Sequence, residues 1–182
     1  MLFPDDAVLI SKFRAGDQKS FTVIHEKYCR RLYGYCYRLL LDELIAEDVV
    51  QDTFIKAFET LSSLEKPDQF YAWLFTIARN KVYGFLRNNR TNGRAHITGD
   101  EGDVWDPESP HTLLVQKETS QIVVEMMNQL KPEYREVLIL RQYDKLSYAE
   151  IAAITCNTVS SVESRLFKAR KALATKLGPY FK

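Results

Sequence analysis

The sequence predicts an all-α protein made of two small helical domains joined by a flexible acidic linker. Apolar residues recur at helical spacing through long stretches, and very little of the chain alternates in the way that strands do. Glycine and proline are scarce, at 7 and 6 of 182 residues, but they gather between residues 91 and 115. A hydrophobic fraction of 46% is ample for a packed core, and 27% charged residues is ordinary.

The distribution of charge supports the same division. Residues 1–92 carry 13 basic and 12 acidic side chains, residues 93–115 carry one against five, and residues 116–182 carry 11 against seven. The net charge of +1 therefore hides a basic C-terminal segment behind an acidic connector. We expect domains at 1–92 and 116–182, with the linker at 93–115.

Periodicity predicts four helices in the first domain, at 5–15, 17–41, 44–62 and 69–90. The second helix has an apolar stripe of Phe21, Ile24, Tyr28, Leu32 and Tyr35, the third has one of Val50, Phe54, Ala57, Phe58 and Leu61, and the fourth has one of Phe70, Leu74, Ile77, Ala78 and Phe85.

The second domain is predicted to contain helices at 116–129, 132–143, 147–155 and 159–177. The last two are separated by the polar break Thr155 to Thr158 and predict a helix-turn-helix. The final helix has an apolar stripe of Val159, Val162, Leu166, Ala169, Leu173 and Leu177.

The polar side of that last helix is suited to the major groove of DNA. Between residues 165 and 182 there are six Lys or Arg and no carboxylate. Such side chains reach base edges and phosphates, whereas the alternative is a solvated amphipathic helix in a bundle. The residues expected to face DNA are Ser160, Ser161, Glu163, Ser164, Phe167, Lys168 and Lys171.

Helix 44–62 has a second face that is typical of a protein-docking surface. Acidic and amide side chains, Asp48, Gln51, Asp52 and Glu59, surround the apolar Ile55. We expect a basic partner there, and the alternative is a solvated face with one stray isoleucine.

Helix 69–90 interleaves aromatic and cationic residues. Five cations and no carboxylate lie between residues 79 and 94. Arginine contacts phosphate and aromatic rings stack on unpaired bases, so this helix is a candidate surface for single-stranded DNA, although a lone basic face is usually only solvated. Its candidate residues are Thr76, Arg79, Asn80, Tyr83, Arg87 and Arg90.

Other classes of function have little support. Asp48 and Asp52 lie one turn apart, but no histidine or nucleophile accompanies them, so an enzyme is not expected. Cys29 and Cys36 lie about 10.5 Å apart along the helix axis, too far to share a zinc ion, so we expect no metal site and no cofactor. Three cysteines without disulfide spacing, no leader and no long apolar run predict a cytoplasmic chain without membrane insertion.

Four ordered motifs make the chain resemble the extracytoplasmic-function (group IV) sigma factors of the bacterial sigma-70 family. They are GDQKSF (16–21), AEDVVQDTFIKAF (46–58), FYAWLFTIARN (70–80) and LSYAEIAAITCNTVSSVESRLFKARKAL (146–173). The resemblance implies a region 2-like first domain that binds core RNA polymerase and opens the minus-ten element of promoter DNA. It also implies a region 4-like second domain that reads the minus-thirty-five element, and an anti-sigma factor as a partner.

The resemblance assigns roles to residues by position. Asp48, Gln51, Asp52 and Ile55 correspond to the surface that binds the polymerase clamp. The loop 62–69 and the helix after it correspond to the part that captures a flipped base. The minus-ten set is Ser63, Leu64, Lys66, Trp73, Thr76, Arg79, Asn80, Tyr83 and Arg87. An acidic linker of this kind either stands in for nucleic acid near the transcript path or is an ordinary spacer.

The chain departs from the family pattern at several positions. Leu64 stands where many members have an aromatic residue, and Cys156 and Thr158 stand where the turn often has Gly and Pro. Glu163 replaces a frequent Lys or Arg, and its carboxylate either accepts from cytosine N4 or repels phosphate. Phe167 is expected to contact a thymine methyl group. The alternative for the whole chain is a stand-alone helix-turn-helix regulator, which would need neither the acidic face nor the basic aromatic helix.

Overall fold

The computed structural model describes residues 3–91 and 113–180, and all regular structure in these ranges is helical. The N-terminal part contains α1 (Asp6–Arg14), α2 (Lys19–Leu40), α3 (Glu43–Thr60) and α4 (Phe70–Thr91), with 3-10 turns at Leu61–Ser63 and Pro67–Gln69. The C-terminal part contains α5 (Leu113–Asn128), α6 (Pro132–Gln142), α7 (Tyr148–Thr155) and α8 (Val159–Leu177). The eight predicted helices are confirmed, with ends that differ by no more than three residues.

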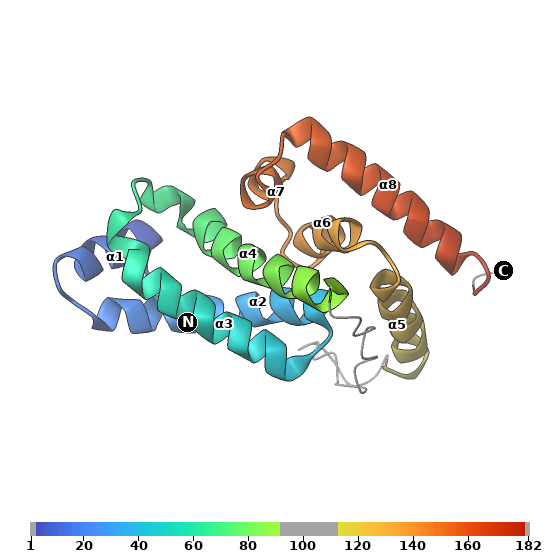
Figure 1. Cartoon of the computed structure of the whole chain (residues 1–182), viewed down its shortest axis with the longest axis horizontal. Coiled ribbons are helices and arrows are strands. Elements are labelled where there is room, and N and C mark those ends of the chain that lie inside the picture. Colours follow the sequence, from blue (N-terminus) through green and yellow to red (C-terminus); the bar gives the residue numbers. More distant parts are fainter. Residues whose placement is uncertain (1–2, 92–112, 181–182) are drawn as a thin grey trace.

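The first four helices form one bundle because their apolar stripes meet (Figure 1). Along α2, residues at helical spacing are fully buried, and they face a matching set on α3 and α4. The central residues of this core are Ile24, Leu32, Tyr35, Cys36, Leu39, Ala46, Ala57, Phe70, Leu74, Phe75 and Ala78. Phe58 lies on the predicted apolar face with its ring 5.1 Å from that of Phe21, but it is 41% exposed. Ile77 and Phe85 are only partly buried, because Phe75 and Val82 fill the centre of α4 instead.

Local sequence sets where these helices start and stop. The Asp42 carboxylate accepts a hydrogen bond from the Ile45 amide at 3.0 Å and so caps α3. Just before it, Leu41 has a φ of 58°, the left-handed conformation that ends α2. The reversal between α2 and α3 therefore takes only two residues and holds the two helices together as an antiparallel pair.

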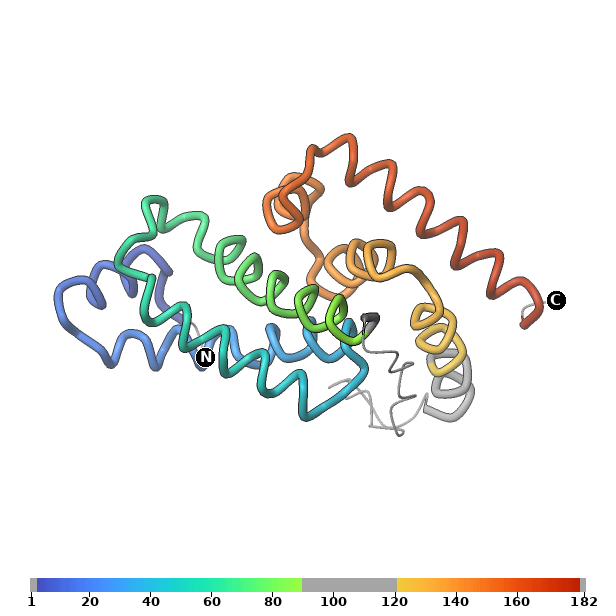
Figure 2. The backbone as a smooth tube through the Cα atoms, in the orientation of Figure 1, coloured from blue at the N-terminus to red at the C-terminus, as the bar shows by residue number. Residues whose placement is uncertain are grey.

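Two of the C-terminal helices, α6 and α7, pack on α2 and α4. Figures 1 and 2 show α7 and α6 beside α4, with α8 along the outer edge. The apolar stripe of α8 is confirmed at Val162, Leu166 and Ala169, whereas Val159 is 43% exposed because it lies in the first turn, before the packed part of the helix. The predicted linker 93–115 lies mostly outside the described residues, and α5 begins at Leu113, three residues before the predicted boundary.

Candidate protein-binding and nucleic-acid interfaces

The acidic face of α3 points to solvent. Asp48, Gln51 and Asp52 are exposed, and the side chain of Ile55 is 52% exposed among them. Leu44, which the sequence prediction missed, is 73% exposed and lies one turn before Asp48 on this face. The spacing of 44, 48, 51, 52 and 55 was the available signal. Two large apolar side chains within an acidic surface make this face a stronger candidate for a docking surface than the single isoleucine that was predicted.

An ion pair connects this acidic face with α4. The Lys81 ammonium lies 3.0 Å from the Asp52 carboxylate, and the Asp52 side chain is 65% exposed. Pairs as exposed as this contribute little to stability because water screens them. Its effect is to orient Asp52 toward α4, while Asp48 and Gln51 stay on the open surface.

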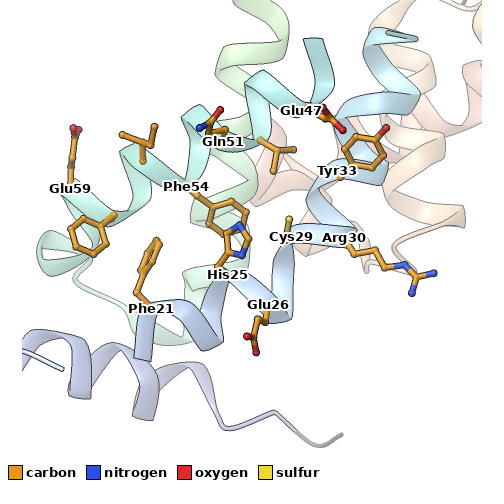
Figure 3. A pocket seen from close by; sticks show the side chains of 13 residues that line it. Phe21, His25, Glu26, Cys29, Arg30, Tyr33, Glu47, Gln51, Phe54 and Glu59 are labelled. Atoms are coloured by element: carbon orange, nitrogen blue, oxygen red, sulfur yellow. The ribbon is translucent and has the colours of Figure 1, made fainter. Parts of the chain in front are cut away.

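A groove of about 910 Å³ runs between α2 and α3 and reaches the same docking surface (Figure 3). Its floor contains aromatic rings from both helices, and the rings of His25 and Phe54 lie 4.5 Å apart. The charged residues that line it are Glu26, Glu47, Glu59 and Arg30, so its wall is acidic on balance. The groove therefore extends the α3 face with an apolar floor of the kind that receives a partner's side chains.

The predicted DNA-contacting residues in the loop before α4 differ in how exposed their side chains are. Ser63 and Lys66 are exposed, and the Ser63 hydroxyl donates to the Thr60 carbonyl at 2.7 Å. The Leu64 side chain is only 8% exposed and belongs to the hydrophobic core, while its carbonyl accepts a hydrogen bond from Arg14. The Leu64 side chain therefore anchors the loop to the hydrophobic core and does not face a bound base.

The C-terminal helices cover part of the predicted DNA-binding face of α4. Asn80 and Arg87 are exposed, and Trp73 is half-buried with its ring 5.7 Å from that of Phe70. Thr76, by contrast, lies 3.4 Å from the Ile154 carbonyl at the end of α7. The predicted surface is therefore only partly open in this conformation.

Arg79 and Tyr83 bind a carboxylate from the other domain. The Arg79 Nε and the Tyr83 hydroxyl each donate to Glu136 at 2.8 Å, and Glu136 is fully buried. The Tyr35 hydroxyl of α2 donates to the same carboxylate at 2.8 Å. Burial, followed by the neighbouring Glu136 charge, raises the pKa of Tyr83 well above its ordinary value. Sequence reasoning missed Glu136, because a single carboxylate within an apolar stretch has no periodic signal.

The helix-turn-helix is confirmed, and its turn is fixed by local hydrogen bonds. Ser147 and Glu150 form a capping box at the start of α7. Cys156 ends α7 with a φ of 52°, and the Thr158 hydroxyl accepts from the Ser161 amide at 3.2 Å to start α8. The Asn157 side chain accepts from Arg165 at 3.1 Å, which ties the turn to the second turn of α8.

The outer face of α8 carries the residues predicted to meet the major groove. Ser161 is half-buried, and the Phe167 side chain is 69% exposed. The other members of the predicted set are all exposed, namely Ser160, Glu163, Ser164, Lys168 and Lys171. A helix buried along Val162, Leu166 and Ala169 and open along this side has the geometry of a recognition helix.

A two-domain transcription factor is the class that this fold and these surfaces define. Residues 24–91 match the family Sigma-70 region 2, and residues 120–173 match Sigma-70, region 4. The chain is 31% identical to the RNA polymerase sigma-H factor of Pseudomonas aeruginosa over 96% of this chain and 94% of that protein. It is 32% identical to the ECF RNA polymerase sigma-E factor of Escherichia coli strain K12, over 96% and 95% respectively.

Solved structures show the same likeness. One is CnrH in complex with the cytosolic domain of CnrY, with a TM-score of 0.72 and 26% identity over 97% of this chain and 99% of that one. Another is the sigma factor RpoE of Bartonella quintana in complex with the anti-sigma factor NepR, with a TM-score of 0.72 and 27% identity over 88% and 98%.

The chain belongs to the extracytoplasmic-function sigma factors of the sigma-70 family. It is a non-enzymatic transcription initiation factor whose partners include core RNA polymerase and promoter DNA. A stand-alone regulator is not expected to match region 2, so that alternative is set aside. None of the helices in the described part of the chain is long and apolar enough to cross a membrane.

Proposed function

We propose that this chain acts in the cytoplasm, where it docks on the polymerase clamp through α3 and directs the enzyme to promoters. The observation that carries the docking assignment is the exposure of Leu44 and Ile55 within the acidic face. Two large aliphatic side chains exposed on one helix face form an apolar patch of the kind that a binding partner covers. Asp48, Gln51 and Asp52 beside them select a basic partner surface.

The minus-ten element is proposed to lie along the loop 62–69 and α4. Ser63, Lys66, Asn80 and Arg87 are exposed and are proposed to contact the DNA backbone or unpaired bases. Leu64 is assigned a supporting role in the loop that is proposed to bind the base, because its side chain lies in the core. Trp73 presents part of its ring next to this surface and could stack on an unpaired base.

The minus-thirty-five element is proposed to bind the outer face of α8. Lys168 and Lys171 supply phosphate contacts, and the exposed Phe167 is placed for a thymine methyl group. Glu163 is the single carboxylate on this helix and is exposed. It is proposed to favour a cytosine, whose N4 amine donates to a carboxylate.

Control by an anti-sigma factor is part of this proposal. Two similar structures are complexes, one of a sigma factor with an anti-sigma factor and one with a cytosolic domain. The acidic groove between α2 and α3 adjoins the α3 docking surface, so a partner bound there would compete with polymerase. Competition of this kind would require no sensor within the chain itself.

The test of the function is reconstitution with bacterial core RNA polymerase on a promoter library. The wild-type chain should give core-dependent, promoter-selective transcripts, and a chain with Asp48→Ala and Gln51→Ala should lose most of them. Glu125→Ala, which removes an exposed carboxylate from α5, is the matched control and should behave as wild type. Tight binding to duplex DNA without any association with core would overturn the proposal.

The role of Glu163 is tested by a base scan of the minus-thirty-five element. Glu163→Lys should shift the preferred base at one position from cytosine toward guanine, by about 1–3 kcal/mol of discrimination. Glu163→Gln is the control, because it keeps the shape and removes the charge. An unchanged preference in both variants would remove Glu163 from the set of base-reading residues.

A further inference from the structure

The helix α1 contacts the loop that the proposed function assigns to the minus-ten element, but none of its own residues is in the set proposed to bind DNA. It lies before residue 24, where the match to Sigma-70 region 2 begins. It contacts both 3-10 turns of the loop that joins α3 to α4, and Figure 1 shows it beside that loop. A helix in this position can set the conformation of a DNA-contacting loop without touching DNA itself.

Both ends of α1 are fixed to the rest of the N-terminal bundle. At its first residue, the Asp6 carboxylate accepts a hydrogen bond from the Tyr28 hydroxyl of α2. In its last turn, the Phe13 ring lies 5.6 Å from that of Phe21 on α2 and 5.2 Å from that of Phe58 on α3. The buried residues between these ends belong to the hydrophobic core. The last turn of α1 is therefore a firm support for whatever its side chains hold.

The loop between α3 and α4 is closed by short-range backbone hydrogen bonds at its two ends. The Leu64 amide donates to the Leu61 carbonyl at 3.2 Å, and the Gln69 amide donates to the Lys66 carbonyl at 3.0 Å. The side chains of Leu61 and Leu64 are both buried. These bonds close the two 3-10 turns, but the peptide group that joins Leu64 to Glu65 lies between the turns and belongs to neither. Its orientation depends on a contact from elsewhere in the fold.

Arg14, the last residue of α1, supplies that contact. Its guanidinium donates to the Leu64 carbonyl, 50 residues further along the chain. Hydrogen bonds from a charged donor are stronger than those from a neutral one, so this bond fixes the plane of the peptide that follows Leu64. Ser63 and Lys66, both exposed and both proposed to contact DNA, lie on either side of that peptide. The directions in which their side chains leave the loop follow from its orientation.

A loop that captures a flipped base benefits from being ordered before DNA arrives. Extruding a stacked base costs free energy, which contacts in the loop must recover. When the loop itself has to be ordered on binding, part of that recovered free energy is lost to the ordering. Arg14 lowers this cost, because it holds the loop from a helix that is already packed on α2 and α3.

We propose that Arg14 is a positioning residue for recognition of the minus-ten element: from α1 it holds the Leu64 peptide and thereby sets the base preference of the loop 62–69. The proposal rests on the assignment of this loop to DNA under the proposed function. It extends that function to a helix that does not itself bind DNA. A bond that served folding alone would change the amount of active protein equally for every base, whereas a positioning bond changes the ratio between bases.

Variants of the full-length chain separate these two roles. Arg14→Met keeps most of the aliphatic stem and removes the donor, and Arg14→Lys keeps a cationic donor. Lys12→Met removes an exposed cation from the last turns of the same helix and is the matched control. Circular dichroism and urea unfolding measure the folding and stability of each variant. If Arg14→Met does not fold, Arg14→Gln, whose side chain is shorter than that of arginine, carries the test.

The measurement is transcription by each chain with core RNA polymerase on a promoter library randomised at both elements, followed by sequencing of the transcripts. At the minus-ten position where the wild type is most selective, Arg14→Met should lower the ratio between the best and the worst base about three- to tenfold, the effect of losing one hydrogen bond that orders the site. Base ratios at the minus-thirty-five element should stay as in wild type. Arg14→Lys should restore most of the minus-ten ratio, and Lys12→Met should match wild type.

Three outcomes overturn the positioning role. One is an unchanged minus-ten ratio in a folded Arg14→Met or Arg14→Gln. Another is a loss of transcription that is equal for all four bases, since Arg14 would then serve stability alone. The third is the same loss of selectivity in Lys12→Met, which would assign the effect to the charge of α1 and not to the bond with Leu64. Failure of the sigma function itself is seen separately, because the wild-type chain would then give no core-dependent, promoter-selective transcripts.

Discussion

At the scale of single residues, the three cysteines show how differently one side chain behaves across this fold. Cys36 is fully buried on α2, Cys29 is partly buried at the groove between α2 and α3, and Cys156 is exposed in the turn of the helix-turn-helix. Burial raises the pKa of Cys36 to about 12 and raises that of Cys29 to a smaller extent. Because the thiolate is the reactive form, burial and pKa both act against labelling of Cys36.

The first prediction concerns the reactivity of these thiols. With a disulfide reagent such as DTNB at pH 8, Cys156 should react first, Cys29 more slowly, and Cys36 only after denaturant is added. Peptide mapping by mass spectrometry assigns each site, and Cys156→Ser should remove the fast phase alone. A Cys36 that reacts in the native chain at the rate of Cys156 would contradict the packing of α2.

Cys156 also carries backbone strain that another residue would relieve. Its φ of 52° lies in the left-handed region, which costs a residue with a Cβ atom roughly 1–2 kcal/mol. Cys156→Gly should therefore stabilise the chain by about 0.5–1 kcal/mol in urea unfolding, after the entropy that glycine loses on folding. Cys156→Ala keeps the Cβ atom and should give no such gain. A gain from alanine alone would show that the thiol, not the backbone, limits stability.

At the scale of elements, α7 depends on its first turn because it has only eight residues. The Ser147 hydroxyl accepts from the Glu150 amide at 3.2 Å, and the Glu150 carboxylate accepts from the Ser147 amide at 2.7 Å. Isolated helices this short are marginal, so the cap and the packing of Ile151 and Ile154 together hold α7 in place. Its position in turn sets the angle at which α8 leaves the turn.

This capping box should make stability depend on pH in a defined direction. Hydrogen bonds from Ser147 lower the pKa of Glu150 below its ordinary value of 4.5. A lowered carboxyl pKa means that the stabilisation is present above pH 4.5 and is lost as pH falls through the folded-state pKa. Ser147→Ala should cost about 1 kcal/mol at pH 7, and that cost should shrink at pH values below the folded-state pKa.

Urea unfolding of Ser147→Ala, Glu150→Gln and wild type between pH 3 and pH 7 checks this prediction. Ser160→Ala, an exposed hydroxyl at the second residue of α8, serves as the comparison and should cost little at any pH. A Ser147→Ala cost that stays constant over the whole range would show that Glu150 does not take part in the cap.

At the scale of the whole molecule, the two domains share a polar contact that links their stabilities. Tyr35 is 1% exposed within the N-terminal bundle, yet its hydroxyl donates to Glu136 of α6. Its ring stays in the N-terminal core, 5.3 Å from that of Phe75. Removing the Tyr35 hydroxyl from α2 is therefore expected to change the stability of α6.

Tyr35→Phe should weaken the contact between the two domains by about 2 kcal/mol, the usual contribution of a hydrogen bond to a charged group. Amide hydrogen exchange in α6 should become faster although the substitution lies in α2. Tyr37→Phe, on the same helix with its ring stacked 6.0 Å from Tyr33, is the control and should leave α6 unchanged. Unchanged exchange in α6 of Tyr35→Phe would mean that the domains unfold and move independently.

The helices and their outward faces were predictable because both depend on residues close together in the chain. Helical spacing identified the acidic face of α3 and the outer face of α8, and the turn residues Thr155 to Thr158 separated α7 from α8. Leu44 was missed although it follows the same spacing, because it lies at the first turn of its helix. Four ordered motifs also sufficed to place the chain in its family.

By itself, the sequence determined the all-helical class, the position of each helix in residues 3–91 and 113–180 to within three residues, and the family. The tertiary structure alone decided that Leu64 is a core residue and that Thr76, Arg79 and Tyr83 face α6 and α7. Periodicity says which side of a helix is polar, but not whether water, DNA or a distant carboxylate satisfies it. That depends on contacts such as Arg79 with Glu136, 57 residues apart in the chain, for which local spacing carries no information.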